Sequence, residues 1–322
     1  MKPDINFIKI HDNESQIKAL LEELILQPRI NALKWSKITH QTPNLKIGYP
    51  GKHLASLITG VKGSKTAARG DDLEDGTEVK SCSRIDQMDK CNDCESPVAR
   101  SEKFCYACGS NNINRKQDSK WLFTIKSERD LQVITQDVKR VVLILGDYPN
   151  FDKQDYETLR FQCFEIWTQS IRNRKFKEIL SNYYYKIYLT NKNSNPKKTP
   201  APKNFWPYSY QFYLSNPILT FSCHVYNAST QPLINIQHYI EPHIDRTDLS
   251  SVLMPIEIFN EKNKEEKLLL QNHLQLKSEN DLPRLIDENL REILPLRDTG
   301  KGFNINTPHV RKSTKSRRNT TK

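Results

Sequence analysis

The sequence predicts an α/β fold, because segments with helical and strand-like hydrophobic patterns alternate over residues 1–181. The clearest strand signal is RVVLILG at 140–146, an apolar run bounded by Gly146 and Pro149 that is typical of a strand buried on both faces. The clearest helix signal lies at 13–34, where apolar residues recur at helical spacing. A chain of 322 residues can form one large domain or two smaller ones.

The first elements follow from local signals along the chain. The first helix is expected to begin near Asn13, which can serve as its N-cap, and to end or kink at Pro28. A second, short helix fits 51–60, where Gly60 supplies a stop signal. The segment TEVKSCS at 77–83 alternates as a strand does.

The later elements are a strand and two helices, followed by a region of mixed character. We expect a strand at 120–127, a helix at 128–139 and a long amphipathic helix at 154–181. The long helix carries four large apolar residues, Phe161, Phe164, Trp167 and Ile171. Further on, ILTFSCHVY at 218–226 is predicted to be a strand, and 261–294 is predicted to be mainly helical.

The charge balance favours a polyanionic partner. The chain has 49 Lys and Arg against 38 Asp and Glu, which gives a net charge of +11 and a pI of about 9.2. Its mean hydropathy is −0.71, and no stretch approaches the roughly 20 apolar residues of a membrane span. The first residues lack a secretory apolar region. We therefore expect a soluble protein of the bacterial or archaeal cytoplasm, without a membrane partner.

An acidic cluster interrupts this basic chain in GDDLEDGTEVKSC at 70–82. A three-residue hairpin loop at Glu74–Gly76 fits the sequence, because glycine readily takes the positive φ that such a loop needs. With this loop, Asp72 lies opposite Glu78, and Lys80 follows on the same face because strand side chains alternate. Two carboxylates and a lysine thus converge on one surface of a sheet.

Apposed carboxylates repel each other unless a cation lies between them, and hard oxygen ligands favour Mg²⁺. The site predicted at Asp72 and Glu78 is therefore a Mg²⁺ site that can bind a phosphodiester as well. Lys80 can orient the attacking water or neutralise developing charge. A two-residue turn would place Asp71 on this face in place of Asp72, and a third interpretation is an exposed acidic hairpin without function.

A second metal site is predicted from four cysteines in two CxxC pairs. They follow the pattern Cys91-x2-Cys94-x10-Cys105-x2-Cys108. Four thiolates at this spacing form a closed, tetrahedral and structural Zn²⁺ site, in preference to two disulfides. The remaining three cysteines, which are expected to be small buried apolar residues, are Cys82, Cys163 and Cys223.

The acidic motif Asp72-x5-Glu78-x-Lys80 resembles the PD-(D/E)xK nuclease signature, although Gly70-Asp71 stands where the named pattern has its proline. Over roughly residues 60–135, which also contain the paired CxxC motifs, the chain is similar to type II restriction endonucleases of the MamI type.

The resemblance implies a PD-(D/E)xK core with a mixed central sheet flanked by helices, and the cysteine pairs as an inserted zinc ribbon. It also implies a Mg²⁺-dependent homodimer that cleaves double-stranded DNA within or near a short specific site. Asp72, Glu78 and Lys80 are then the catalytic set. Metal-assisted hydrolysis of this kind is expected to leave 5′-phosphate ends.

Four regions are expected along the chain. Residues 1–190 form the catalytic core, with the zinc ribbon inserted at 84–119. NKNSNPKKTPAPKN at 191–204, with four lysines and three prolines, is expected to be a linker or exposed loop. Residues 205–309 are assigned to DNA recognition and dimerisation, and 310–322 to a disordered basic tail.

Candidates for contacting DNA are Arg297 and Lys301, which flank a glycine-containing turn. A surface turn without function is the alternative there. For the whole chain, the alternatives to a site-specific endonuclease are a repair or modification-dependent nuclease with the same core, and a noncatalytic zinc-ribbon protein that binds nucleic acid.

Overall fold

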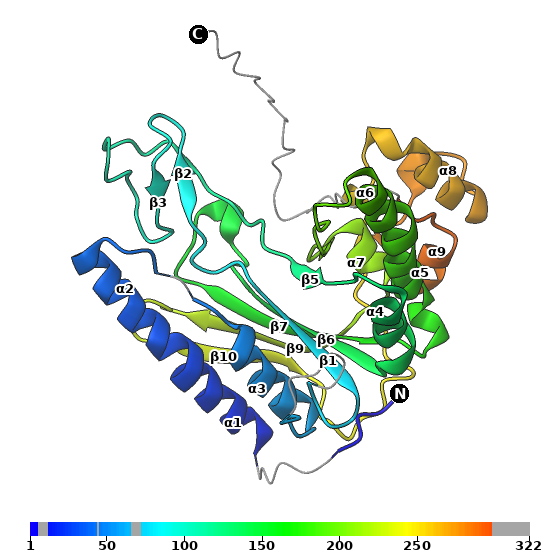
Figure 1. Ribbon diagram of the computed structural model, residues 1–322, viewed down its shortest axis with the longest axis horizontal. Coiled ribbons are helices and arrows are strands. Elements are labelled where there is room, and N and C mark those ends of the chain that lie inside the picture. The colour runs from blue at the N-terminus through cyan, green and yellow to red at the C-terminus, as the bar shows by residue number, and fades with distance from the viewer. Residues whose placement is uncertain (6–11, 44, 66–71, 298–322) are drawn as a thin grey trace.

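The computed structural model describes residues 1–5, 12–43, 45–65 and 72–297. Its centre is a five-stranded mixed sheet in the order β1-β6-β7-β9-β10 (Figure 1). The strands are β1 (Thr77–Ser83), β6 (Arg140–Asp147), β7 (Leu159–Trp167), β9 (Ile218–Tyr226) and β10 (Leu233–Tyr239). β1 runs parallel to β6, and the other neighbours are antiparallel.

One face of the sheet is covered by the N-terminal helices α1 (Asn13–Leu21), α2 (Gln27–Thr39) and α3 (Gly48–Thr59) (Figure 1). A π-helical turn, η1 (Glu22–Leu26), joins α1 to α2, so the helical stretch continues to Thr39. The helix therefore does not end at Pro28, and that expectation is wrong. Pro28 lies in the first turn of α2, just after a change of hydrogen-bond pattern that accommodates a residue without an N–H.

The other face is covered by a lobe of short helices and by a two-stranded sheet (Figure 1). The two strands are β5 (Trp121–Phe123) and β8 (Lys203–Phe205). The helices are α4 (Glu128–Gln132), η2 (Val133–Asp137), α5 (Arg174–Asn182), η5 (Tyr183–Tyr188), α6 (Leu189–Ser194), α7 (Tyr210–Leu214), α8 (Lys264–His273) and α9 (Glu288–Glu292). With helices on both faces, the mixed central sheet flanked by helices is confirmed.

Smaller elements complete the described chain. A three-stranded sheet in the order β3-β2-β4 stands apart from the central sheet, and β11 pairs with β12. Their strands are β2 (Asp89–Cys91), β3 (Pro97–Val98), β4 (Ile113–Asn114), β11 (Met254–Pro255) and β12 (Leu285–Ile286). The 3-10 helices are η3 (Phe151–Lys153), η4 (Ile171–Asn173), η6 (Ile256–Ile258), η7 (Glu261–Asn263) and η8 (Glu279–Asp281). None of the described helices combines the length and apolar character that crossing a membrane requires.

The central strand β6 separates two hydrophobic cores. Its eight residues are all buried, with Val142 and Ile144 facing the N-terminal helices and Leu143 and Leu145 facing the lobe. Trp121 of β5 belongs to the second core and donates its indole N–H to the Ile144 carbonyl at 2.9 Å. This hydrogen bond joins β5 to β6. The burial of β6 on both faces confirms the expectation for this strand.

The long helix expected at 154–181 is wrong. The chain instead forms β7 and then α5, because β7 is a central strand with apolar side chains on both faces. Phe161 lies in the core beneath the N-terminal helices, and Phe164 lies in the core of the lobe, with a register shift just before it. Because β7 is buried on both faces, its sequence lacks the apolar–polar alternation of a half-buried strand, and its apolar residues also fit helical spacing.

Several other expectations are confirmed. The strands at 77–83 and 218–226 are β1 and β9, and Gly60 ends α3 with φ +70°. The 261–294 region contains α8 and α9, separated by η8 and the short strand β12. The three cysteines expected in the core are buried, namely Cys82, Cys163 and Cys223. Burial raises the pKa of each of these thiols to about 12 and keeps it protonated.

The central sheet crosses the boundary expected near residues 191–204. β9 and β10 come from the region assigned to recognition and dimerisation, yet they pair with β7 in one sheet. The 191–204 segment begins at the end of α6 and finishes in β8, which pairs with β5. Residues 1–190 and 205–309 therefore share one sheet, and the division between them stays a proposal about function.

Candidate active site and metal sites

The acidic hairpin has the predicted three-residue loop. Leu73 and Thr77 are antiparallel bridge partners, and the Leu73 N–H donates to the Thr77 carbonyl at 3.1 Å. Gly76 has φ +78°, and its N–H donates back to the Leu73 carbonyl at 3.1 Å. The alternative two-residue turn is not formed. Asp71, the ligand which that turn would favour, lies outside the described residues.

One carboxylate of the cluster, Asp75, forms a buried ion pair within the protein. Asp75 accepts a hydrogen bond from the Arg140 guanidinium at 2.8 Å and another from the Thr77 hydroxyl at 2.6 Å. Arg140 begins β6 and is fully buried, so this ion pair joins the hairpin to the central sheet. The negative charge of Asp75 thus compensates a buried cation and does not face the surface of Glu78 and Lys80.

The three predicted catalytic side chains lie together at the start of β1. The Asp72 carboxylate accepts the Val79 N–H at 2.8 Å and the Lys52 ammonium at 2.5 Å. Glu78 is buried and forms an ion pair with Lys80, two residues further along the same face. Val79 points into the opposite core, as alternation requires. Asp72, Glu78 and Lys80 therefore converge as predicted.

These side chains line one open cavity of about 400 Å³. Its polar lining consists of Lys52, Asp72, Glu78, Lys80, Thr124 and Asp130. Its remaining lining comes from Val79, Phe123, Ile125 and Ile134. The carboxylates of Asp72 and Glu78 are hard oxygen donors, and a Mg²⁺ ion held by one or two carboxylates keeps several waters. The donor set therefore fits Mg²⁺ at this cavity.

The sequence did not predict two of the residues that line the cavity, Lys52 and Asp130. Lys52 is on α3, and Asp130 is in the first turn of α4, where its carboxylate accepts the Lys126 N–H at 2.8 Å. Neither residue belongs to a local motif. Only the packing of α3 and α4 around β1 brings them to Asp72 and Glu78, so no signal in the sequence could have found them.

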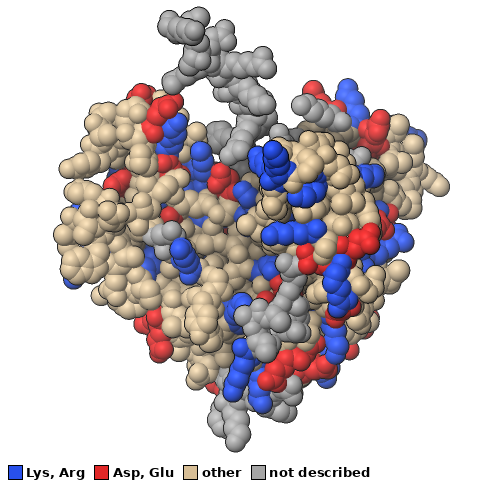
Figure 2. Space-filling view, viewed as in Figure 1, with Lys and Arg blue, Asp and Glu red and all other residues tan. Residues whose placement is uncertain are grey.

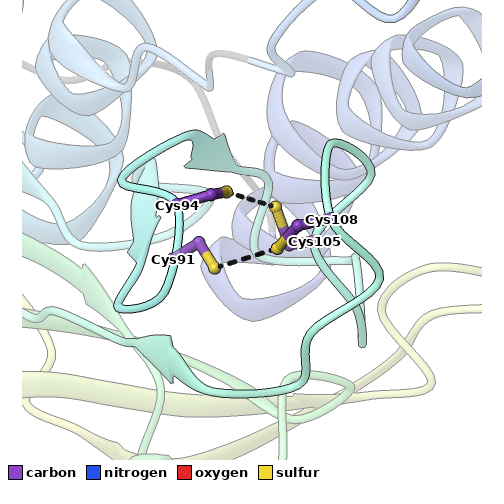
Figure 3. A group of neighbouring side chains, drawn as sticks. All are labelled: Cys91, Cys94, Cys105 and Cys108. Atoms are coloured by element: carbon purple, nitrogen blue, oxygen red, sulfur yellow. Dashed lines mark hydrogen bonds between the residues drawn. The ribbon is translucent and has the colours of Figure 1, made fainter.

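The four clustered cysteines converge on a single point, as Figure 3 shows. Their sulfur atoms all lie within 4.8 Å of one another, with Cys91 and Cys108 3.6 Å apart and Cys94 and Cys105 3.5 Å apart. Among the described residues this is the one group of three or more His, Cys, Asp or Glu side chains positioned to share an ion. Four sulfur donors fit Zn²⁺ and leave no coordination position for a substrate.

Each CxxC pair is shaped by a tight backbone turn. The Cys91 carbonyl accepts the Glu95 N–H at 3.1 Å, and the Cys105 carbonyl accepts the Gly109 N–H at 2.7 Å. Glu95 and Gly109 have φ values of +64° and +73°. The two halves of the cluster therefore repeat one geometry, with glycine in the left-handed position of the second turn only.

The thiols are electrostatically coupled. Hydrogen bonds from the hydroxyl and backbone of Ser96, together with the neighbouring thiols, lower the pKa of Cys94 to about 6. For Cys108 the backbone hydrogen bond at Ser110 lowers the pKa, but the Cys94 thiol and burial outweigh it and raise the value to about 12. One thiolate forms readily and opposes the next, a conflict that a divalent cation removes.

The cysteine module, residues 84–119, contains a buried ion-pair group, and one arginine of this group contacts the main body. The Asp89 carboxylate accepts hydrogen bonds from Arg100 at 2.8 Å and from Arg115 at 2.9 Å. The Arg100 guanidinium also lies over the rings of Tyr148 at 5.6 Å and Phe151 at 4.9 Å. These contacts place Arg100 between the module and the core beneath the N-terminal helices.

Arg297, a predicted DNA contact, makes internal contacts instead. Its guanidinium pairs with Glu266 at 2.5 and 2.9 Å and lies 3.7 Å over the Tyr210 ring. The contact of Arg297 with DNA stays a prediction. Lys301 lies outside the described residues.

Paired carboxylates and lysines in an open cavity of a basic chain are the groups that a metal-dependent hydrolase of a polyanion needs. The model of the MamI restriction endonuclease family matches residues 34–257, more than half of the chain, and the chain belongs to this family.

A curated relative is the type II restriction enzyme MamI of Microbacterium ammoniaphilum. The two sequences are 33% identical over 75 residues, which is 22% of this chain. The chain spans 24% of the length of that relative. No solved structure matches this chain.

Proposed function

We propose that this protein is a type II restriction endonuclease that hydrolyses phosphodiesters of double-stranded DNA at a specific site. The observation that carries the proposal is the convergence of Asp72, Glu78 and Lys80 in one open cavity, in a member of a restriction endonuclease family. In this proposal the hairpin and β1 are the catalytic part of a PD-(D/E)xK core.

Asp72 and Glu78 would hold the Mg²⁺ ion, which supplies an activated water and charge stabilisation at the phosphate. The Val79 N–H orients the Asp72 carboxylate from the backbone of β1. Lys80, which pairs with Glu78, would orient the attacking water or stabilise charge on the phosphate. In this hydrolysis a water oxygen would add to phosphorus, the bond from phosphorus to the 3′ oxygen would break, and that oxygen would take up a proton, which gives a 5′-phosphate and a 3′-hydroxyl.

Zn²⁺ at the four cysteines would act as a structural ion. The cluster belongs to a separate small sheet, and the Asp89 group joins that sheet to the body beside the N-terminal core. Closed coordination by four sulfurs provides no open position for substrate, so the proposed chemistry rests on the carboxylate cavity alone.

The direct test is digestion of a sequenced phage DNA by purified protein with Mg²⁺ and, in parallel, with EDTA. We expect discrete fragments with Mg²⁺ and intact DNA with EDTA, and sequencing of the ends should reveal one recurring site with 5′-phosphates. Binding of DNA without any cleavage would instead support a noncatalytic zinc-ribbon protein. Cleavage restricted to methylated or damaged DNA would indicate a modification-dependent or repair nuclease.

A further inference from the structure

A second cavity of about 250 Å³ adjoins the catalytic cavity. Both are lined by Thr124 and Ile125, the residues that follow β5. The second cavity is bounded on its far side by the segment 199–202, and Lys126 and Tyr188 complete its lining. A chain-like ligand that extended from Glu78 past Thr124 would reach this segment.

The segment that bounds the second cavity is held in place at several points. The Lys192 ammonium donates to the Pro196 carbonyl at 2.8 Å, and the Lys198 N–H donates to the Asn195 carbonyl at 3.1 Å. The Tyr183 hydroxyl donates to the Ala201 carbonyl, and Lys203 pairs with Phe123 in the β5–β8 sheet. Residues 195–202, here termed the basic wall, are thus part of the folded body.

The basic wall carries positive charge that is not neutralised nearby. Lys197 and Lys198 are exposed, and within the part of the chain that the structure describes no carboxylate forms an ion pair with either. The sequence contains no Asp or Glu between Glu178 and Glu241. In Figure 2 both basic and acidic side chains border the hollow at the centre of the face shown.

We infer that Lys197 and Lys198 bind the phosphate backbone of the DNA beside the scissile phosphate. The inference rests on the proposed function, because the scissile phosphate defines where the strand enters the path. Lysine is a compact point charge suited to phosphate, and the three prolines of the wall reduce the entropy lost on ordering it. Such contacts position a duplex without reading its sequence.

The test compares full-length K197A/K198A with wild type, using fluorescence anisotropy of a labelled duplex at several salt concentrations in EDTA. The slope of log K against log salt is negative, and each lost phosphate contact reduces its magnitude by about 0.9. The magnitude for the double variant should therefore be smaller than that of wild type by up to roughly 1.8. At about 0.1 M salt its affinity should fall roughly tenfold, and with Mg²⁺ its KM should rise while kcat stays near that of wild type. K197R/K198R should keep the wild-type slope, because it keeps both charges.

The matched control is K34A/K37A, which removes two exposed lysines from α2 that line neither cavity. The inference is overturned if the K197A/K198A slope is unchanged, if the control lowers it equally, or if only kcat falls. These outcomes are independent of the proposed function, whose own failure would be wild-type protein that leaves DNA intact with Mg²⁺. In that case a changed slope would still establish the basic wall as a DNA-binding surface.

Discussion

At the scale of single residues, neighbouring carboxylates of the acidic hairpin have different roles. Asp72 faces the cavity with Glu78, whereas Asp75 faces away and compensates the buried Arg140. We predict that Asp72→Asn and Glu78→Ala each lower cleavage by at least about a hundredfold, because they remove proposed metal ligands. Their affinity for specific DNA should stay within about threefold of wild type, because these groups do not contact bases. Single-turnover cleavage and anisotropy measure the two quantities.

Asp71→Asn is the matched control for the loop geometry. It should retain activity, because the three-residue loop brings the Asp72 carboxylate to the Val79 N–H of β1. Full activity in Asp72→Asn together with loss of activity in Asp71→Asn would contradict this assignment.

Asp75→Ala should act on stability and leave the chemistry unchanged. Its removal leaves Glu165, at 3.6 Å, as the carboxylate partner of the buried Arg140 guanidinium, and breaking a buried ion pair costs up to about 3–5 kcal/mol. Urea unfolding should show this loss in the free energy of unfolding, while kcat per folded molecule at low temperature stays near wild type. A loss of kcat without loss of stability would place Asp75 in the catalytic machinery instead.

At the scale of elements, local signals predicted what local sequence determines. The hairpin loop, β1 and the four-cysteine site each depend on residues close together in the sequence, and all are present as expected. The sequence pattern predicts a helix where β7 lies, because the burial of β7 on both faces depends on two cores that distant segments build. For the same reason Lys52 and Asp130 could not be placed at the cavity from the sequence.

The cysteine module should be a zinc site that stabilises the fold. We predict about one Zn²⁺ per chain by elemental analysis, since four thiolates at this spacing bind Zn²⁺ tightly and binding contributes to folding. Cys94→Ser should lose the ion and aggregate or unfold at lower temperature. The matched control, Cys223→Ala, removes a buried cysteine outside the cluster and should retain the ion. Active wild-type protein without zinc would reject the site.

At the scale of the whole molecule, the described chain presents one Asp72, Glu78 and Lys80 cavity, whereas a duplex has two antiparallel strands. We therefore propose a twofold homodimer, whose symmetry would match that of a palindromic site. The apolar residues Phe161 and Phe164 of the region expected to be a helix at 154–181 are buried in the two cores of one subunit, so they do not provide a subunit interface.

Subunit mixing tests the dimer and the single cavity together. Wild-type protein mixed and re-equilibrated with excess Lys80→Ala protein should convert supercoiled plasmid mainly to nicked circles, because a mixed dimer has one competent cavity and cuts one strand. Sedimentation on a duplex containing the site should give the mass of two chains, and Lys34→Ala is the control subunit, which should leave linear product dominant. A mixture that yields only linear and uncut plasmid, with one chain on the DNA, would mean that a single subunit cuts both strands in turn.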